Sequence, residues 1–314
     1  VARTQAFLRS IRRRHTADGL LEGAQRKGDG EILPASHEGG TQVADAYYDV
    51  ATEFYEWGWG TSFHFADHHA GETFAQSMRR HEYYLAGRLG VQKGDRLLDC
   101  GCGIGGPARN IARFTGAHVT GVTLNQYQVD RGLALCKSEG VEEQVAIVHS
   151  DFTRLPFPDA SFDAVYAIES TCHAPDRAGV YSEIFRVLKP GGTFACYEWC
   201  LTDAFDPDSE HHRGIKREIE IGRESSDGVH HLVHHSVCVP ALVHAGFTAL
   251  ESCDRARARG AQGGYPWYKE LTPSWNPLVW PRFQFNEVML RAMPRLLRLG
   301  ESFGILPVGT ERTQ

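Results

Sequence analysis

The glycine-rich stretch from Arg96 to Gly106 constrains the fold of this 314-residue chain more than any other segment. It reads Arg-Leu-Leu-Asp-Cys-Gly-Cys-Gly-Ile-Gly-Gly, so a short apolar run ends at Asp99 and residues with almost no side chain follow. Pro107 then stands near the first position of a predicted helix, where its missing N–H costs little. A strand, a glycine turn and a helix N-terminus in this order form a cradle for a nucleotide-like ligand.

The spacing of the glycines does not by itself identify the ligand. Gly101, Gly103 and Gly106 also satisfy the dinucleotide pattern, which is a weak signal when it stands alone. Asp99 directly before the glycines would repel a pyrophosphate but attract the ammonium group of a methionine moiety. The second expected strand, at residues 118–124, ends without the acidic residue that binds the ribose of NAD. The residues therefore favour S-adenosylmethionine as the cofactor.

From Val91 onward the chain alternates short apolar runs with helical segments at the spacing of βαβ units. The expected strands are residues 96–100, 118–124, 145–149, 162–167 and 193–199. This alternation predicts a Rossmann-like α/β fold with a mostly parallel twisted sheet and helices on both faces. Pro190 and Gly191 are expected to end the helix before the fifth strand. A helix over 237–245, capped by Gly246, and a strand over 248–253 are expected to continue the core.

Polar residues stand at the carboxyl ends of four expected strands, where ligands of such sheets bind. The cofactor-binding candidates are Asp99, Cys100, Gly101, Gly103, Gly105, Thr123, Asn125, Gln128, Ser150, Asp151, Phe152 and Glu169. Asp151 and Phe152 would face an adenine, because a carboxylate accepts from the exocyclic amine and an aromatic ring stacks on the base. The alternative role for Asp151 is that of a helix or turn cap.

An aromatic stretch at residues 43–65 carries the second informative pattern. Eight aromatic residues occur there, with acidic residues and His64 among them. Aromatic clusters usually belong to a core, but Gly58 and Gly60 interrupt a helix here, so we expect the rings on a bent segment beside a cleft. Aromatic faces stabilise cations, and a carboxylate or imidazole among them could take a proton. Such a wall would suit a reaction that passes through a carbocation.

Glu169 and His173 lie four residues apart just beyond the fourth expected strand. One helical turn would place them on the same face, and a carboxylate near an imidazole is a suitable acid/base pair. A hydrogen bond between Glu169 and a buried backbone group is the alternative. Tyr197, Glu198 and Trp199 reach the same edge of the sheet from the fifth strand.

Composition excludes some functions and leaves others open. The net charge of −6 does not favour a nucleic-acid partner. The eight cysteines include no C-x-x-C pair, which favours reduced, intracellular thiols. No Cys or carboxylate completes a recognised ligand spacing around the histidines of residues 201–236, so no metal is expected. No signal peptide or membrane-spanning run is visible. The basic residues near the N-terminus would suit an anionic membrane surface or a solvated tail.

The chain divides by composition into a core and several flanking parts. We expect a basic extension and linker over 1–40, an aromatic and helical substrate cap over 41–90, a cofactor-binding core over 91–200, a helical insertion over the active site at 201–236, a core continuation over 237–255, and a C-terminal substrate cap over 256–314. The last segment contains Trp267 and Tyr268 in an aromatic, irregular context.

Three motifs together resemble the sterol 24-C-methyltransferase family. They are Phe54-Tyr-Glu-Trp-Gly-Trp-Gly-Thr-Ser-Phe-His-Phe65, Leu98-Asp-Cys-Gly-Cys-Gly-Ile-Gly-Gly-Pro-Ala-Arg109 and Tyr166-Ala-Ile-Glu-Ser-Thr-Cys-His-Ala-Pro175, with Tyr197-Glu-Trp199 and Pro266-Trp-Tyr268 in support. The resemblance spans roughly Ala46 to Arg298. It implies a class I methyltransferase that uses S-adenosylmethionine to methylate the side-chain alkene of a sterol at C24, through a carbocation, a hydride shift and a deprotonation.

The resemblance also implies roles for individual residues and partners. The catalytic candidates are Glu169, His173, Glu56 and His64. The substrate-binding candidates are Tyr55, Trp57, Trp59, Phe63, Tyr197, Glu198, Trp267 and Tyr268. A sterol or related isoprenoid is the expected substrate, and the resemblance implies association with the endoplasmic reticulum. Peripheral membrane contact and a homo-oligomer are left open.

This chain departs from the family pattern at two places. The family commonly has Tyr at the position of Trp57, and it ends with an apolar strand beside the one expected at 248–253. No segment after Gly304 reads as that strand, because the sequence there is polar and interrupted by proline. The alternatives are an O-, N- or C-methyltransferase for another isoprenoid or small molecule, and a protein that binds a lipid or S-adenosylmethionine without catalysis.

Overall fold

The computed structural model describes residues 52–53, 55–56, 58–174, 176–221, 232–256 and 298. The chain divides into two compact units. The larger unit contains the segment that ends at His64 together with Met78–Cys253, and the smaller contains Phe65–Ser77 and the residues from Asp254 onward. The candidate site described below is built entirely from the larger unit.

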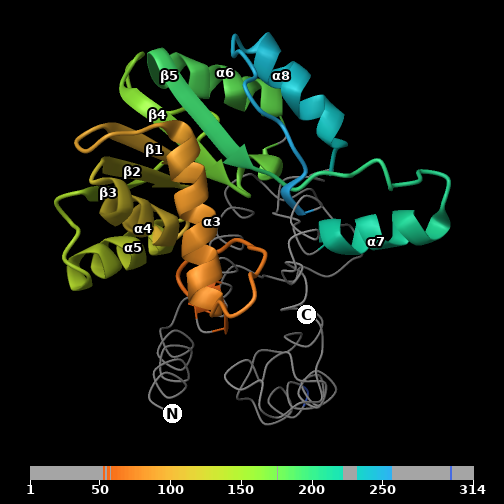
Figure 1. The fold of residues 1–314 in the computed structure, drawn as a ribbon, viewed down its shortest axis with the longest axis horizontal. Coiled ribbons are helices and arrows are strands. Elements are labelled where there is room, and N and C mark those ends of the chain that lie inside the picture. Colours follow the sequence, from red (N-terminus) through yellow and green to blue (C-terminus); the bar gives the residue numbers. More distant parts are fainter. Residues whose placement is uncertain are drawn as a thin grey trace, which may run out of the picture. The chain divides into compact units, whose positions relative to one another are not determined.

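A five-stranded parallel sheet forms the centre of the larger unit (Figure 1). Its strands are β1 (Arg96–Cys100), β2 (His118–Thr123), β3 (Val145–His149), β4 (Phe162–Ile168) and β5 (Leu188–Tyr197). They are ordered β3-β2-β1-β4-β5, and every neighbouring pair is parallel. The order reverses between β1 and β4, which is where ligands of such sheets bind. The predicted Rossmann-like fold is therefore confirmed.

Helices flank both faces of this sheet (Figure 1). The helices α3 (Phe74–Leu89), α4 (Gly106–Thr115) and α5 (Gln126–Ser138) contribute to the core on one face. The helices α6 (Arg177–Val187) and α8 (Cys238–His244) contribute to the core on the other. The described residues also form α7 (Glu210–Ile221) and the 3-10 turns η1 (Thr171–His173) and η2 (His235–Val237). None of the described helices is both long enough and apolar enough to cross a membrane.

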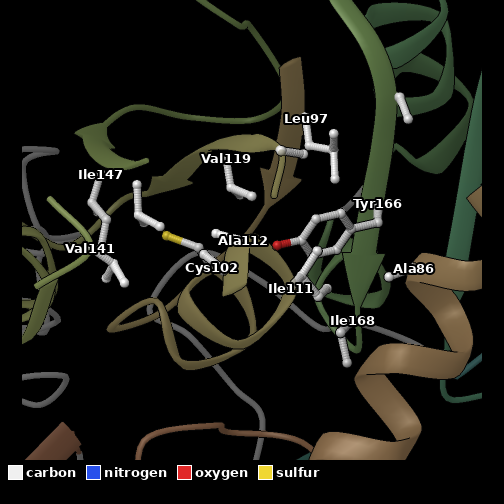
Figure 2. Packing of buried hydrophobic residues seen from close by; sticks show 14 of the residues in the cluster. Ala86, Leu97, Cys102, Ile111, Ala112, Val119, Val141, Ile147, Tyr166 and Ile168 are labelled. Atoms are coloured by element: carbon white, nitrogen blue, oxygen red, sulfur yellow. The ribbon is translucent and has the colours of Figure 1, made fainter. Parts of the chain in front are cut away.

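The sheet has two apolar cores because successive strand residues point to opposite faces. Leu97 and Tyr166 face the side of α4, whereas Leu98 and Val165 face the side of α6. Figure 2 shows the first core, with Leu97, Val119, Ile147 and Tyr166 of the strands beside Ile111 and Ala112 of α4. Burial on both faces explains why the strands read as nearly continuous apolar runs.

The fifth strand begins earlier than the sequence predicts. Helix α6 ends at Val187, and β5 begins at Leu188 instead of Thr193. Leu188 pairs with Phe162, but the next aligned pair is Thr193 with Ala164, so the residues between them on β5 form an irregularity in the ladder. Proline is tolerated at such bulges because the local ladder bond is already missing. Pro190 and Gly191 therefore interrupt the start of a strand and do not end the helix.

The strand predicted over residues 248–253 is wrong. Helix α8 and the glycine after it match the prediction, since Gly246 has φ 107° just beyond the helix end. Residues 248–253 follow without any ladder pairing to the described part of the chain, and Leu250 is 84% exposed. A strand requires a neighbour for its backbone N–H and C=O groups, and the described residues provide none here.

Candidate active site at the carboxyl edge of the sheet

The glycine loop after β1 contacts the loop after β4 so closely that no side chain fits between them. Gly101 has φ 87°, and a Cβ on it would lie 2.4 Å from the Cβ of Ser170 and 3.6 Å from a ring carbon of Phe152. The hydroxyl of Ser170 also donates to the carbonyl of Cys100. The structure therefore brings together residues that follow β1, β3 and β4. The sequence predicts that Gly101 and Phe152 bind the cofactor, but it does not predict a role for Ser170.

The aromatic segment packs onto the same glycine loop. A Cβ on Gly103 would lie 3.3 Å from the ring of Phe63, and one on Gly106 would lie 2.0 Å from the carbonyl oxygen of Thr61. The ring centroids of Phe63 and Tyr55 are 5.4 Å apart. Tyr55 is more than half exposed. A predicted substrate-binding residue, Phe63, thus covers a predicted cofactor-binding loop.

This segment turns later than expected. The backbone of Glu53, Tyr55 and Gly58 is helical, so Gly58 does not break the helix. The chain leaves the helix at Trp59 and Gly60, where Gly60 has φ 116°. The backbone N–H groups of both residues donate to the carbonyl of Tyr55. The indole N–H of Trp59 donates to the carbonyl of His64 at 2.8 Å, which fixes the indole within the turn.

The helical part of the segment is tied to α5 by three side-chain contacts. Gln128 donates to the hydroxyl of Thr52 at 3.1 Å, and Tyr127 donates to Glu53 at 3.0 Å. Arg131 donates to both carboxylate oxygens of Glu56. The amide oxygen of Gln128 also accepts from Thr123 at 2.6 Å. Two predicted site residues, Glu56 and Gln128, therefore have contacts that hold the aromatic segment in place.

A fully buried carboxylate, Glu82 of α3, organises the polar groups beneath the aromatic segment. It accepts from the hydroxyl of Ser62 at 2.7 Å and from the amide of Asn110 at 2.7 Å. One of its oxygens lies 3.0 Å from Nε2 of His64, which is only 2% exposed. The sequence prediction missed Glu82. The available signal was its place on the apolar face of α3, four residues after Met78.

Asp99 of β1 is buried on the same face of the sheet and has unused hydrogen-bonding capacity. It is 2% exposed and is aligned with Tyr166 of β4 in the ladder. Burial raises its pKa to about 7; Tyr166 and His64 oppose the rise, whereas Glu82 adds to it. Even so, Oδ2 of Asp99 and the hydroxyl of Tyr166 have no partner at hydrogen-bonding geometry among the described residues. A buried oxygen of this kind is a natural contact for a cationic or N–H-bearing ligand.

Glu169 is held in an unusual backbone conformation at the end of β4. Its φ is 54°, a region that non-glycine residues rarely occupy outside functional sites and turns. Its N–H donates to the carbonyl of Tyr197 at 2.8 Å, and its Oε2 accepts from the indole of Trp199 at 2.7 Å. His173 ends the short turn η1 and is exposed. The acid/base pair of Glu169 and His173 stays a prediction.

Glu198 holds that turn in place from the end of β5. Its carboxylate accepts from the N–H of Thr171 at 3.0 Å, from the Thr171 hydroxyl at 2.5 Å and from the N–H of Cys172 at 2.9 Å. Burial raises the pKa of Glu198, and these hydrogen bonds reduce the rise. Tyr197 stacks on His81 with ring centroids 3.8 Å apart and donates to its carbonyl. Tyr197 and Glu198, which are both predicted to bind the substrate, therefore contact other residues of the protein.

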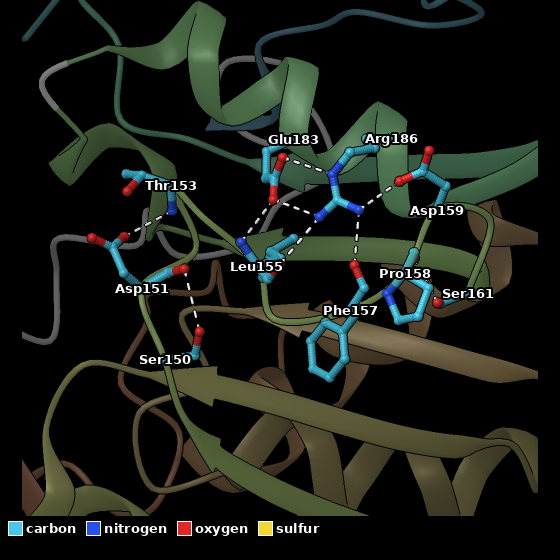
Figure 3. A network of polar contacts seen from close by, with 10 residues as sticks. All are labelled: Ser150, Asp151, Thr153, Leu155, Phe157, Pro158, Asp159, Ser161, Glu183 and Arg186. Atoms are coloured by element: carbon cyan, nitrogen blue, oxygen red, sulfur yellow. Dashed lines mark hydrogen bonds and ion pairs between the residues drawn. The ribbon is translucent and has the colours of Figure 1, made fainter.

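The ends of β2 and β3 carry polar residues with local structural roles. Asn125 caps α5 by accepting from the N–H of Gln128 at 2.8 Å. Asp151 is exposed and accepts from the N–H of Thr153 at 2.7 Å, which is the turn-capping role considered as its alternative (Figure 3). In the same figure Arg186 binds Glu183, Asp159 and two backbone carbonyls, and so fixes the loop between β3 and β4.

Three predicted substrate-binding residues, Trp57, Trp267 and Tyr268, lie outside the described residues. The predicted C-terminal cap over 256–314 falls almost entirely outside them as well. Among the remaining predicted residues, Cys100 is buried within β1, and Gly105 precedes α4 with φ 72°. Ser150 follows β3 and its N–H donates to the carbonyl of Thr123 at 2.9 Å.

Sequence comparisons agree with this geometry. A family model described as a methyltransferase domain matches residues 98–196. The chain is 47% identical over 272 residues to the cycloartenol-C-24-methyltransferase of Arabidopsis thaliana, a match covering 87% of this chain and 78% of that protein. It is 50% identical over 277 residues to the sterol 24-C-methyltransferase of Yarrowia lipolytica, covering 85% of this chain and 69% of that protein.

Solved structures show the same fold at lower identity. The crystal structure of the cyclase SpnF matches with a TM-score of 0.57 and 26% identity, over 69% of this chain and 76% of that one. A geranyl diphosphate methyltransferase in complex with GPP and sinefungin matches with a TM-score of 0.57 and 19% identity, over 69% of this chain and 84% of that one. At this identity the second match supports the fold alone.

Proposed function

The chain belongs to the sterol 24-C-methyltransferase family, and from that premise we propose that it uses S-adenosylmethionine to methylate the side-chain alkene of a sterol at C24. The observation that carries this proposal is the contact between the aromatic segment and the glycine loop. Phe63 lies against Gly103, and Thr61 lies against Gly106. A substrate held by the first segment would meet a cofactor held by the second.

The residues around the glycine loop fit S-adenosylmethionine. The buried Asp99 has an oxygen without a hydrogen-bond partner in the part of the chain that the structure describes, which suits the cationic amino-acid end of the cofactor. The ring of Phe152 beside Gly101 suits an adenine, and the glycines leave bare backbone for close approach. When bound, this cofactor supplies an electrophilic methyl group on a sulfonium sulfur.

In this proposal the chain positions the alkene and protects the charge that develops on the sterol. The π electron pair of the alkene would form the new C–C bond to the methyl group while the bond from that methyl group to sulfur breaks, so that a neutral thioether leaves and a tertiary cation remains on the sterol side chain. A hydride then migrates, and loss of a proton restores a double bond. Tyr55 and Phe63 supply aromatic faces that stabilise positive charge and exclude water, which would otherwise trap the cation.

We propose Glu169 as the group nearest the reacting centre. It follows β4 directly and precedes Ser170, which packs on the glycine loop, and Trp199 orients its carboxylate. His64 is the second candidate, because Glu82 would stabilise its imidazolium if it accepted the proton. His64 is almost fully buried, so we assign the proton-accepting role first to Glu169.

The first test is methyl transfer from labelled S-adenosylmethionine to detergent-dispersed zymosterol, cycloartenol and a sterol with a saturated side chain. We expect label in one or both alkenes and none in the saturated control. Label in the saturated sterol would indicate transfer to another position. Absence of label from every sterol, in a protein that binds the cofactor, would favour another isoprenoid or small-molecule acceptor.

A second test separates catalysis from cofactor binding. Glu169→Gln is expected to abolish most product formation and to leave the Kd for S-adenosylmethionine within about twofold, since a lost acid or base costs roughly 100-fold or more in rate. Glu142→Gln, at an exposed position, serves as the matched control. An equal loss of cofactor affinity in Glu169→Gln would make Glu169 a cofactor contact.

A sterol acceptor also implies that the protein meets a membrane surface or a carrier, because sterols are almost insoluble in water. We propose peripheral contact with sterol-containing membranes. Co-flotation of the full chain with vesicles that contain zymosterol tests this, and recovery in the protein-only fraction would argue for a carrier.

A further inference from the structure

We propose that Asp203, His234 and His235 form a binding site for a divalent transition metal such as Zn²⁺. The ligand atoms of these three residues all lie within 4.8 Å of one another. The Nε2 atoms of His234 and His235 are each 3.1 Å from Oδ1 of Asp203. Two imidazoles and one carboxylate are a donor set that suits Zn²⁺ and its neighbours in the first transition series.

Backbone hydrogen bonds bring the two segments that carry these ligands together. The N–H of Leu201 donates to the carbonyl of Val233 at 2.8 Å, and the N–H of His235 donates to the carbonyl of Leu201 at 3.0 Å. Leu201 and His234 form an isolated parallel bridge. The main chain therefore sets the spacing between Asp203 and the histidine pair before any metal binds.

A neighbouring hydroxyl is placed to orient one of the two imidazoles. Nδ1 of His234 lies 2.8 Å from Oγ of Ser236 and also accepts from the backbone N–H of Ser236 at 3.3 Å. In the metal-free protein the ring proton is therefore on Nε2, where it faces Asp203. Metal binding requires this proton to move to Nδ1, where it would donate to Oγ of Ser236 and leave the lone pair of Nε2 to the metal, as is usual for metal-bound histidines. Metal binding thus replaces a hydrogen bond that already joins these groups.

The sequence predicts no metal in this region, so the proposed site differs from that prediction. Asp203 and His235 are 32 positions apart in the sequence. A separation of this length matches no recognised spacing of metal ligands, so the sequence alone does not connect the two residues. The fold supplies the missing ligand across the loop that follows β5. A metal there would join this loop to the start of α8, and three protein ligands would leave further positions to water.

The test is metal titration of the untagged 314-residue chain by calorimetry with Zn²⁺ and by visible absorption with Co²⁺. We expect one site for each chain. Asp203→Asn and His235→Gln should each weaken binding by at least about tenfold. His211→Gln is the matched control, because His211 belongs to another adjacent histidine pair, on α7, and should bind as the wild type does.

Circular dichroism and the Kd for S-adenosylmethionine serve as folding controls for all three variants. Zn²⁺ should raise the thermal midpoint of the wild type and of His211→Gln, and should leave that of Asp203→Asn unchanged. The proposal is overturned if Asp203→Asn keeps wild-type affinity, or if His211→Gln loses as much affinity as His235→Gln.

Discussion

Asp99 and Glu198 are carboxylates at the carboxyl ends of two strands of one sheet, yet their surroundings differ in a decisive way. Burial raises the pKa of both groups. Glu198 accepts three hydrogen bonds from the turn that begins at Thr171, whereas Oδ2 of Asp99 accepts none from the residues that the structure describes. A carboxylate whose oxygens accept hydrogen bonds from its own chain stabilises the fold. A carboxylate with a buried oxygen that accepts none is available to bind a ligand.

The largest effect is expected at Gly101, where the loops that follow β1 and β4 meet. In Gly101→Ala the new Cβ would overlap Ser170 at 2.4 Å, at a φ of 87° that alanine resists. We expect a loss of about 3–4 kcal/mol in the free energy of unfolding and no detectable cofactor binding. Urea unfolding and calorimetry measure both.

The double variant Gly101→Ala with Ser170→Gly sharpens this result. The double variant should regain the part of the unfolding free energy that the single variant loses through overlap with Ser170. It should still lack the part that is lost because alanine resists the positive φ at position 101. An unchanged stability in the single variant would show that the two loops do not pack as described.

The next largest effect is expected for Glu198→Ala. Two backbone N–H groups and the Thr171 hydroxyl would lose their acceptor, at a cost of about 3 kcal/mol in the free energy of unfolding. Cofactor affinity should change little, because Glu198 contacts its own chain. A large loss of affinity with normal stability would reverse the scaffold role assigned to Glu198.

Asp99→Asn should show the opposite pattern. In the cofactor-free protein the pKa of Asp99 is raised from 3.8 to about 7. The protonated carboxyl therefore favours the folded state at low pH, and this contribution to the free energy of unfolding is lost as the pH rises from about 4 to about 7. The variant should remove this loss of stability and weaken S-adenosylmethionine binding by about 10–100-fold at pH 8.

The pH dependence of the affinity for S-adenosylmethionine tests the role of Asp99 more directly than the affinity at one pH does. Ionised Asp99 attracts a cationic ligand, so wild-type affinity should rise between pH 6 and pH 8, and the Asp99→Asn profile should be flat. Glu142→Gln, at an exposed carboxylate outside the candidate site, is the control and should keep the wild-type slope. A sloping profile in Asp99→Asn would place the titrating group elsewhere.

Trp199→Phe is expected to have the smallest effect of the four. It removes the indole N–H that bonds Glu169, and should lower kcat by about tenfold with cofactor affinity unchanged. In a Glu169→Gln background the same substitution should have almost no further effect. Independent losses in the double variant would mean that Trp199 acts through another contact.

The sequence predicts the centre of this fold well because its signals there are local. The bounds of β1 and β3 match the prediction, since turn residues mark both ends of each run. The strand over 248–253 fails because pairing depends on a neighbour that a local pattern does not supply. The start of β5 fails because a helix stop and a bulge use the same residues, Pro190 and Gly191.

The same distinction applies to the site. The sequence predicts that the aromatic segment and the glycine loop serve one reaction, and the structure places them in contact. It does not predict that Glu56 pairs with Arg131 or that Glu82 lies beneath His64. The partner of a polar side chain is set by tertiary packing, which spacing along the chain does not encode.

The contact at Gly106 also limits how this protein can change through evolution. The atom that faces Gly106 is the backbone carbonyl oxygen of Thr61, at 2.0 Å from the position of a Cβ. A clash with a side chain, such as that of Phe63 at Gly103, can be relieved by a second substitution in the partner. A backbone oxygen is common to all twenty residue types, so no exchange at position 61 would rescue a larger residue at 106. Lineages that keep this packing can vary the aromatic wall, but they inherit a fixed glycine beneath it.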